Sequence, residues 1–199
     1  MQTPDGRDRA PAVNLGKRVM DCVNYCRTET LRNGASVTIR AVRGDDRERF
    51  VRAFGLLDRD SIYTRFFGFK SELTPAELDR ITSPNSAREV GLVVTVGSGP
   101  GETIVASGRY IAHAAPDGAR TAEIAFVVEE DYQRLGIAGR LLSHLAGIAR
   151  DNGIDAFEAE VLASNKPVLA VLARSGLPMR TTEDSGVRHV TLVLGAGPA

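Results

Sequence analysis

The sequence predicts a mixed α/β (α+β) domain, in which a mostly antiparallel central sheet carries helices on both faces. Three apolar-rich segments follow one another through glycine-containing turns, and strands joined by short turns pair antiparallel. Further along the chain, helical spacing alternates with single strands, and a strand–helix–strand unit places its two strands in parallel. The expected order is one strand, a group of helices, three strands, and then helix, strand, helix and strand.

The first strand and the helices after it follow from local spacing. Residues 36–41 alternate apolar and polar side chains, which is typical of a strand. Phe50, Val51 and Phe54 form an apolar stripe on a helix that has acidic residues in its first turn. The sequence Thr74-Pro-Ala-Glu fits a capping box with proline at the first helical position. We expect helices over residues 45–57, 61–67 and 75–81.

The remaining elements follow from turn sequences and periodicity. Residues 97–101 and 115–118 are turn sequences that separate three strands. Ile137, Leu141 and Leu145 repeat with helical spacing. We expect strands over residues 89–96, 103–112, 121–129, 156–161 and 187–194. Helices are expected over residues 136–152 and 166–175, each followed by a glycine that is typical of a helix end.

The composition excludes several classes of protein. The chain has 199 residues, with 25 basic and 25 acidic side chains and a formal net charge of zero. Proteins that neutralise nucleic-acid phosphates carry a basic surplus, so we expect no nucleic-acid partner. No apolar run reaches the ~18–20 residues of a membrane helix, and residues 1–16 lack the apolar core of a secretory signal. Two cysteines cannot form a disulfide framework, so the expected location is the cytoplasm.

We expect one folded domain over residues 34–196. Residues 1–33 are polar and form the expected flexible N-terminal extension, in which residues 17–27 could form a short helix with Cys22 and Cys26 on one side. We interpret these cysteines as small apolar residues rather than a redox or metal pair, because no suitably spaced histidine or further cysteine accompanies them. The three histidines are scattered as well, so we expect no metal site.

One segment of the sequence points to an anion-binding site. Residues 126–142 form a strand, a polar turn and a helix whose first turn contains Gly136 and Gly139. A helix N-terminus offers unpaired N–H groups and partial positive charge, and small residues let a phosphate approach the backbone. The segment lacks the Gly-Lys-Ser/Thr of a P-loop and the GxGxxG spacing of a dinucleotide site. Glycine spacing alone would equally fit an ordinary strand-to-helix turn.

The same segment resembles a known family. The sequence QRLGIA at residues 133–138 fits the Q/R-x-x-G-x-G/A acyl-CoA signature of the GNAT superfamily of N-acetyltransferases. The order of elements over residues 36–194 is also similar to the GNAT fold. Within the superfamily, the chain most resembles the acetyltransferase domain of bacterial protein lysine acetyltransferases. The stretches that carry this likeness are VTIRAVR at 37–43, SIYTRFFG at 61–68 and EIAFVV at 123–128.

The resemblance implies acetyl-CoA as the acyl donor and assigns residues to it. Main-chain groups of Phe126, Val127 and Val128 would contact the pantetheine arm, and Asn165 would also contact CoA. The residues implied at the pyrophosphate are Arg134, Leu135, Gly136, Ile137, Ala138 and Gly139. The Arg134 side chain would either add positive charge beside the phosphates or remain solvated.

Transfer to an amine also requires a base, because a lysine amine with a pKa near 10.4 is protonated at neutral pH. A carboxylate, or a water that it orients, can remove this proton during attack. The resemblance implies Glu123 as the base, whereas Glu160 lies near the position that some other GNAT enzymes use; either could instead be a solvated strand residue. Leu172 stands where many GNAT enzymes have a tyrosine that protonates the CoA thiolate, so the thiolate would leave unassisted or take a proton from water.

The chain is therefore expected to be an N-acetyltransferase that moves an acetyl group from acetyl-CoA to a primary amine by direct attack, with a strand N–H near Val128 stabilising the oxyanion. The expected acceptor is a protein lysine. A small-molecule amine is one alternative, and a non-catalytic acyl-CoA-binding module is another. The residues Tyr63, Arg65, Phe66 and Phe67 either line the acceptor entrance or belong to the core. We expect a monomer or a homodimer with no metal and no membrane partner.

Overall fold

The computed structural model describes residues 22–66, 68, 70–83, 86, 88–114 and 119–195. Eight strands form one sheet in the order β1-β2-β3-β4-β5-β6-β8-β7. The strands are β1 (Cys26–Thr30), β2 (Ser36–Ala41), β3 (Glu89–Val96), β4 (Thr103–Ala114), β5 (Arg120–Val128), β6 (Ala156–Leu162), β7 (Met179–Asp184) and β8 (Val187–Val193). β5 and β6 run parallel, and the other neighbouring strands run antiparallel. The predicted mixed, mostly antiparallel sheet is confirmed.

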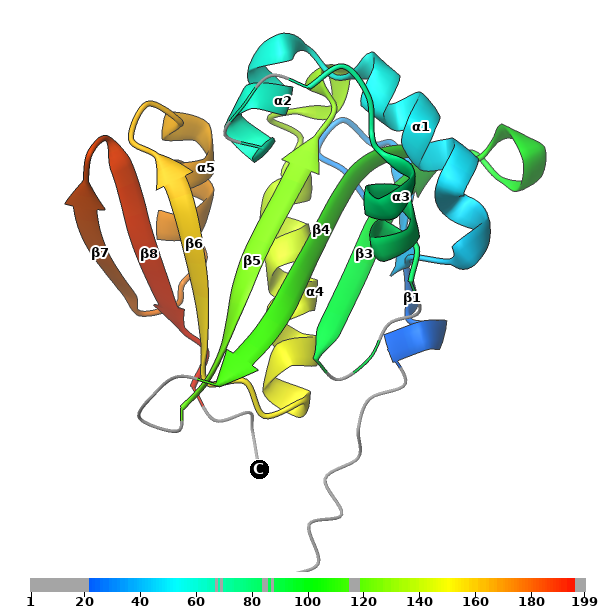
Figure 1. Cartoon of the computed structure of the whole chain (residues 1–199). Helices are drawn as coiled ribbons and strands as arrows, with labels where there is room; N and C mark the ends of the chain where they lie inside the picture. Colours follow the sequence, from blue (N-terminus) through cyan, green and yellow to red (C-terminus); the bar gives the residue numbers. More distant parts are fainter. Residues whose placement is uncertain are drawn as a thin grey trace, which may run out of the picture.

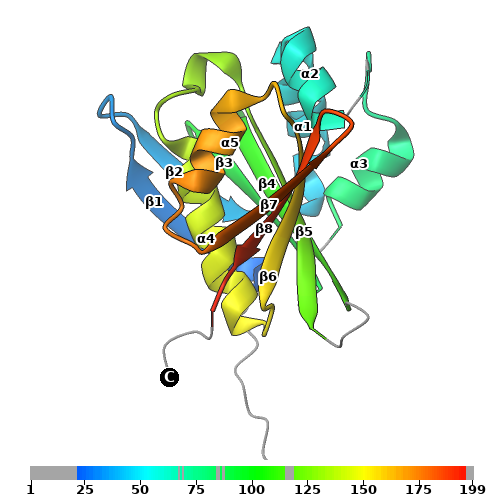
Figure 2. The same ribbon diagram turned by 90° about the vertical axis from the view of Figure 1, so that its left-hand side faces the viewer.

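Helices cover both faces of this sheet, as predicted (Figure 1). On one side lie α1 (Arg47–Leu56), α2 (Arg59–Phe66) and α3 (Pro75–Ile81), and on the other lie α4 (Ile137–Asp151) and α5 (Lys166–Ala173) (Figure 2). The described residues also contain the 3₁₀ turns η1 (Cys22–Asn24), η2 (Gly44–Asp46), η3 (Gly99–Gly101) and η4 (Glu130–Tyr132). None of the described helices is long and apolar enough to span a bilayer.

The main core lies between the sheet and α4. The predicted apolar stripe of this helix is buried, and Leu141 and Leu145 are completely inaccessible to solvent. Gly108 of β4 lies beneath the helix, because a Cβ there would stand only 3.1 Å from Cδ1 of Leu145. The absence of a side chain at this position therefore lets α4 approach the sheet closely.

The N-terminal helices form a smaller core on the other face. Phe50 and Phe54 of α1 are buried as predicted, whereas Val51 is exposed. The predicted capping box of α3 is present: the Thr74 hydroxyl accepts from the N–H of Glu77 at 3.3 Å, and the Glu77 carboxylate accepts from the N–H of Thr74 at 2.8 Å. Local sequence signals were therefore sufficient to place these helices.

Two edge strands, β1 and β7, were not predicted. The helix expected over residues 17–27 is wrong where the structure describes it, because η1 is a single 3₁₀ turn and β1 pairs with β2. Cys22 is buried and Cys26 is exposed on β1, so the two do not share a helix face. The boundary expected at residue 34 consequently falls inside the folded domain, since β1 belongs to the sheet. Residues 1–21 and the expected turn at 115–118 lie outside the described residues.

A buried ion-pair network ties β2 to the segments around it. Arg40 is 2% exposed and donates two hydrogen bonds of 2.7 Å to the carboxylate of Asp46, which is fully buried. Its Nε also donates to Glu102 at 2.8 Å, just before β4. Burial alone would raise the pKa of Asp46, but the hydrogen bonds from Arg40 and from the backbone of Arg43, together with the charges of Arg40 and Arg49, lower that pKa overall. The network therefore ties β2 to η2 and to the residue before β4.

Candidate active site

An opening in the sheet separates β5 from β6. The two strands pair at Thr121 with Ala156, at Ala122 with Phe157 and at Glu123 with Glu158. β5 continues to Val128 and β6 to Leu162, beyond the last paired residues. The strands diverge toward these ends (Figure 1), and α2 packs against β5 beside the opening.

The backbone of β5 directs alternate amide groups into this opening. The N–H of Glu129, the residue after β5, donates to the carbonyl of Val105 in β4 at 3.0 Å. Asp155, just before β6, donates instead to the carbonyl of Arg120 at 2.7 Å. The backbone N–H and C=O groups of successive strand residues point to opposite edges of the strand. The backbone groups of even-numbered residues in β5 therefore face β6.

Phe126 and Val128 are therefore the residues whose main-chain N–H groups face the opening, where an extended molecule can pair as a strand would. Gln133 donates to the carbonyl of Val128 at 3.2 Å and so holds the turn that follows. Val127, which was also expected to contact the pantetheine arm, pairs its backbone with Ser107 of β4. Its side chain lines a groove on the α1 side instead.

The loop between β5 and α4 has the backbone shape of an anion-binding site. Gly136 is the N-cap of α4 and has φ 91°, and Arg134 has φ 60°, so both lie in the left-handed region. Left-handed residues next to right-handed ones turn successive N–H groups toward one concave surface. The first N–H groups of α4, from Ile137 to Gly139, have no carbonyl within the helix, because Arg140 makes the first bond back to Gly136. The predicted pyrophosphate residues thus lie together on this loop and first helical turn.

A pocket of about 400 Å³ lies between α2 and the end of β6. Its lining residues are Asp60, Tyr63, Thr64, Leu162, Ser164, Asn165 and Pro167. Asn165 is also the N-cap of α5, because its side-chain oxygen accepts from the N–H of Val168 at 3.3 Å. Of the aromatic cluster expected near the acceptor entrance, Tyr63 is 39% exposed and lines this pocket. Phe67 and the side chains of Arg65 and Phe66 lie outside the described part.

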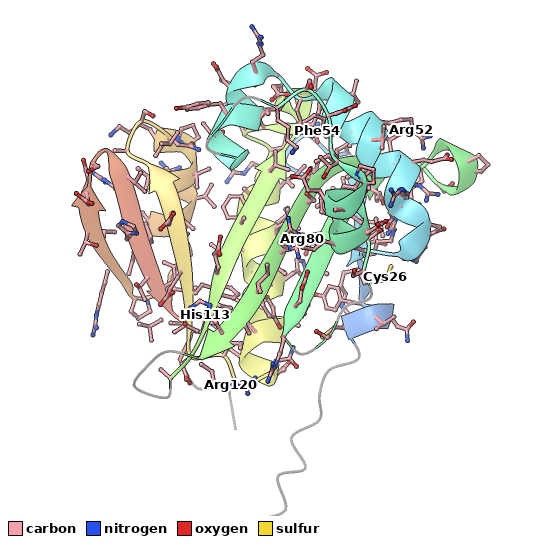
Figure 3. The ribbon with its side chains drawn as sticks, viewed as in Figure 1. Cys26, Arg52, Phe54, Arg80, His113 and Arg120 are labelled. Carbon is pink, nitrogen blue, oxygen red and sulfur yellow. The ribbon has the colours of Figure 1, made fainter. Side chains whose placement is uncertain are left out.

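Three carboxylates share the sheet face that points away from α4. Glu123 occupies the last paired position of β5, opposite Glu158, and both side chains alternate with residues buried against the main core. Glu158 lies 3.1 Å from His113 of β4 (Figure 3), and Glu160 lies 3.4 Å from His189 of β8. Sequence reasoning missed Glu158, although its alternation with Glu160 on one strand placed both on the same face.

A narrow apolar groove of about 80 Å³ lies on the same face, between α1, α3 and the sheet. Phe50 and Phe54 of α1 line it, as do Ala125 and Val127 of β5; Figure 3 labels Phe54. Glu129 also lines it; its Oε2 is buried and has no hydrogen-bond partner among the described residues. Burial raises the pKa of this carboxyl group. The groove therefore combines mainly apolar walls with the charged residues Glu89, Arg109 and Glu129.

Two further predictions concern the position of Leu172 and the binding of a metal ion. Leu172 is completely buried in the core, so the side chain at this position is packing rather than a proton donor. Among the described residues, no group of three His, Cys, Asp or Glu side chains is arranged to hold a metal ion.

Comparisons with known proteins agree with this geometry. The family model for the acetyltransferase (GNAT) family matches residues 60–177. The chain is 30% identical over 158 residues to acetyltransferase PA5475 of Pseudomonas aeruginosa, covering 79% of this chain and 83% of that protein. It is also 30% identical to acetyltransferase Pat of Mycolicibacterium smegmatis, covering 45% of that protein.

A solved structure, the GNAT domain of S. lividans PAT, matches with a TM-score of 0.76 and 30% identity, covering 84% of this chain and 96% of that domain. The family model extends over more than half of the chain, and it includes the signature at residues 133–138. The chain therefore belongs to the GNAT family of N-acetyltransferases, enzymes that use acetyl-CoA as the acyl donor.

Proposed function

We propose that this N-acetyltransferase modifies lysine side chains of proteins and that Glu123 is the general base. The observation that carries the proposal is the position of Glu123 at the point where β5 and β6 separate. A thioester bound along the opening, beside the N–H groups of Phe126 and Val128, would have its carbonyl on the same strand as this carboxylate, about 10–16 Å further along. A cationic amine that approaches over the acidic sheet face would meet Glu123 first.

The chemistry follows from these groups. The lysine ammonium group first loses a proton to Glu123 through intervening water, and the neutral amine then attacks the thioester carbonyl. The second nitrogen proton passes to water as the tetrahedral intermediate forms. The N–H of Val128 would donate to the developing oxyanion, because β6 has already diverged at that point. The carbonyl then re-forms as the carbon–sulfur bond breaks, and CoA leaves as a thiolate. With a leucine at position 172, the thiolate takes its proton from water.

A protein acceptor is supported by the openness of the acidic face. Glu123 and Glu160 are both exposed. Glu158 pairs with Glu123 across the two strands and lies two residues before Glu160 on β6. A long lysine side chain presented from a protein surface can reach such a face without entering an enclosed pocket. The negative charge of the three carboxylates would attract the ammonium group before deprotonation.

A small apolar amine is the second candidate, and one observation favours it. The groove beneath α1 is lined mainly by apolar side chains, and Glu129, whose Oε2 is buried, is one of two carboxylates in its lining. This combination would bind a compact molecule that carries an apolar body and a single amine. Glu160 remains the alternative base in either case.

The test measures CoA release from acetyl-CoA with polylysine, spermidine and an aminoglycoside as acceptors. We expect polylysine to be the best acceptor, and we expect Glu123→Gln to lower kcat by ~10²–10⁴-fold, as loss of a general base does. Glu160→Gln should have a much smaller effect. The matched control is Glu183→Gln, which removes a carboxylate paired with Arg188 on the distant β7–β8 hairpin.

A near wild-type rate in Glu123→Gln, with acetyl-CoA affinity unchanged, would show that Glu123 is not the base. Acetylation of spermidine or the aminoglycoside without acetylation of polylysine would instead establish the small-amine alternative. Acetyl-CoA affinity is measured separately by calorimetry, so that donor binding and acceptor chemistry are distinguished.

A further inference from the structure

We propose that Arg32, at the tip of the β1–β2 hairpin, binds a phosphate group of acetyl-CoA and so completes the donor site. This inference depends on the use of acetyl-CoA by the family and is independent of the acceptor proposed above. Arg32 lies outside the signature and within the segment that the sequence predicted to be an extension.

The Arg32 guanidinium lies beside the anion-binding loop. Its Nε lies 3.6 Å, and its Cζ 3.9 Å, from the point that a Cβ on Gly136 would occupy. Gly136 is the N-cap of α4, at the centre of the anion-binding loop. An exposed cation therefore lies in contact with the backbone turn whose N–H groups would hold the pyrophosphate.

The guanidinium of Arg32 has no competing partner in the described ranges of the chain. No hydrogen bond or ion pair joins Arg32 to the residues that the structure describes. The acidic residue in the same hairpin, Glu29, is already paired with Arg140 and His144. Arg32 therefore presents its donors to an incoming anion without first breaking an internal ion pair.

The β1–β2 hairpin is fixed to α4, the helix that follows the anion-binding loop. Glu29 accepts from Arg140 and lies 2.7 Å from Nε2 of His144, and Arg140 also donates to the carbonyl of Thr30 at 2.7 Å. The hydroxyl of Tyr25 bonds to Nδ1 of the same histidine. Arg140 and His144 lie in the first two turns of α4, so these bonds hold β1 beside the start of the helix.

The tip itself is anchored as well. Leu31 is 3% exposed and packs in the main core, and its N–H donates to the carbonyl of Ala35 at 2.8 Å across the turn. Arg32 follows directly after this buried residue. Its backbone is consequently held in place, and only the side chain must be ordered when the phosphate binds.

The chemistry fits a phosphate rather than another part of acetyl-CoA. A guanidinium donates a planar pair of hydrogen bonds that matches a phosphate, and it remains charged at all physiological pH values. The helix N-terminus adds partial positive charge at the same place. Arg32 and the N–H groups of the loop would then contact the anion from two different segments of the chain.

The experiment compares donors with and without phosphate groups on the intact chain. Calorimetry with CoA should show about tenfold weaker binding for Arg32→Ala, the size expected for one charge-assisted hydrogen-bonded contact. Arg32→Lys should recover part of the affinity. Acetyl-pantetheine, which lacks phosphates, should bind equally to Arg32→Ala and to the wild type in the same calorimetric measurement.

The control is Arg27→Ala in the same hairpin, whose guanidinium lies 5.3 Å from the ring centroid of Tyr25 instead. It should bind CoA as the wild type does. Unchanged CoA affinity in Arg32→Ala, or an equal loss for CoA and acetyl-pantetheine, would overturn the proposal. Because no acceptor is present in the calorimetric measurement, its outcome does not depend on the identity of the general base.

Discussion

The two edges of β5 differ sharply in pairing. β4 pairs with β5 over nine residues, from Ala106 with Val128 to Ala114 with Arg120, whereas β6 pairs over only three. On the β4 side of β5, the sheet continues to the buried ion pair of Arg40 and Asp46. On the β6 side, β5 borders the opening of the donor site. β5 therefore holds the sheet together through its pairing with β4 and leaves the amides on its other side available to a ligand. Stability and donor binding should therefore be separable by substitution.

The largest stability effect is expected at the buried ion pair of Arg40 and Asp46. Asp46→Ala leaves the guanidinium of Arg40 buried without its main partner, which typically costs ~3–5 kcal/mol of unfolding free energy. Urea denaturation measures this loss. Asp79→Ala, which removes the exposed partner of Arg47, is the control and should cost less than ~1 kcal/mol. Equal losses in the two variants would contradict the distinction between buried and exposed pairs.

An intermediate effect is expected at the open edge. Gly136→Ala forces a side chain into the left-handed region, at a cost of ~1–2 kcal/mol, and places its Cβ against Arg32. We expect a modest fall in stability together with a clear loss of CoA affinity, measured by calorimetry.

The control for this variant is Gly147→Ala, in the middle of α4, where a Cβ meets nothing within 4 Å. It should raise stability by up to ~1 kcal/mol and leave CoA affinity unchanged. If both glycine variants bind CoA normally, the backbone shape at Gly136 is not required for the donor site.

The smallest effect is expected at Glu129, which directly follows β5 and bonds to Val105 of β4. Its pKa is raised by burial, so the native state binds the proton more tightly than the unfolded chain, whose ordinary value is 4.5. The resulting stability is fully present below that value and is lost as pH rises through the raised pKa. Glu129→Gln should therefore be more stable than the wild type at pH 7, by less than ~1 kcal/mol. Thermal unfolding at pH 7 and at about pH 4 should show this advantage only at the higher pH.

Local signals in the sequence were sufficient for most of the fold. The helices, the capping box at Thr74 and the strands with a buried face were all predicted, because side-chain periodicity reports which face is buried. β7 could not be found in this way, since every one of its residues is exposed and its strand conformation comes from backbone pairing with β8. β1 was missed for the same reason.

The fold class, the family and the loop that would hold a phosphate could be read from the amino-acid sequence, because they depend on periodicity and on a short contiguous motif. The place where β5 and β6 separate, and the amides of β5 that face that opening, became evident from the three-dimensional structure. The fold also brought Arg32 against Gly136 and placed Glu158 beside Glu123. These contacts join residues far apart in the chain, and they depend on strand register and on the packing of β1 against α4, which no local pattern encodes.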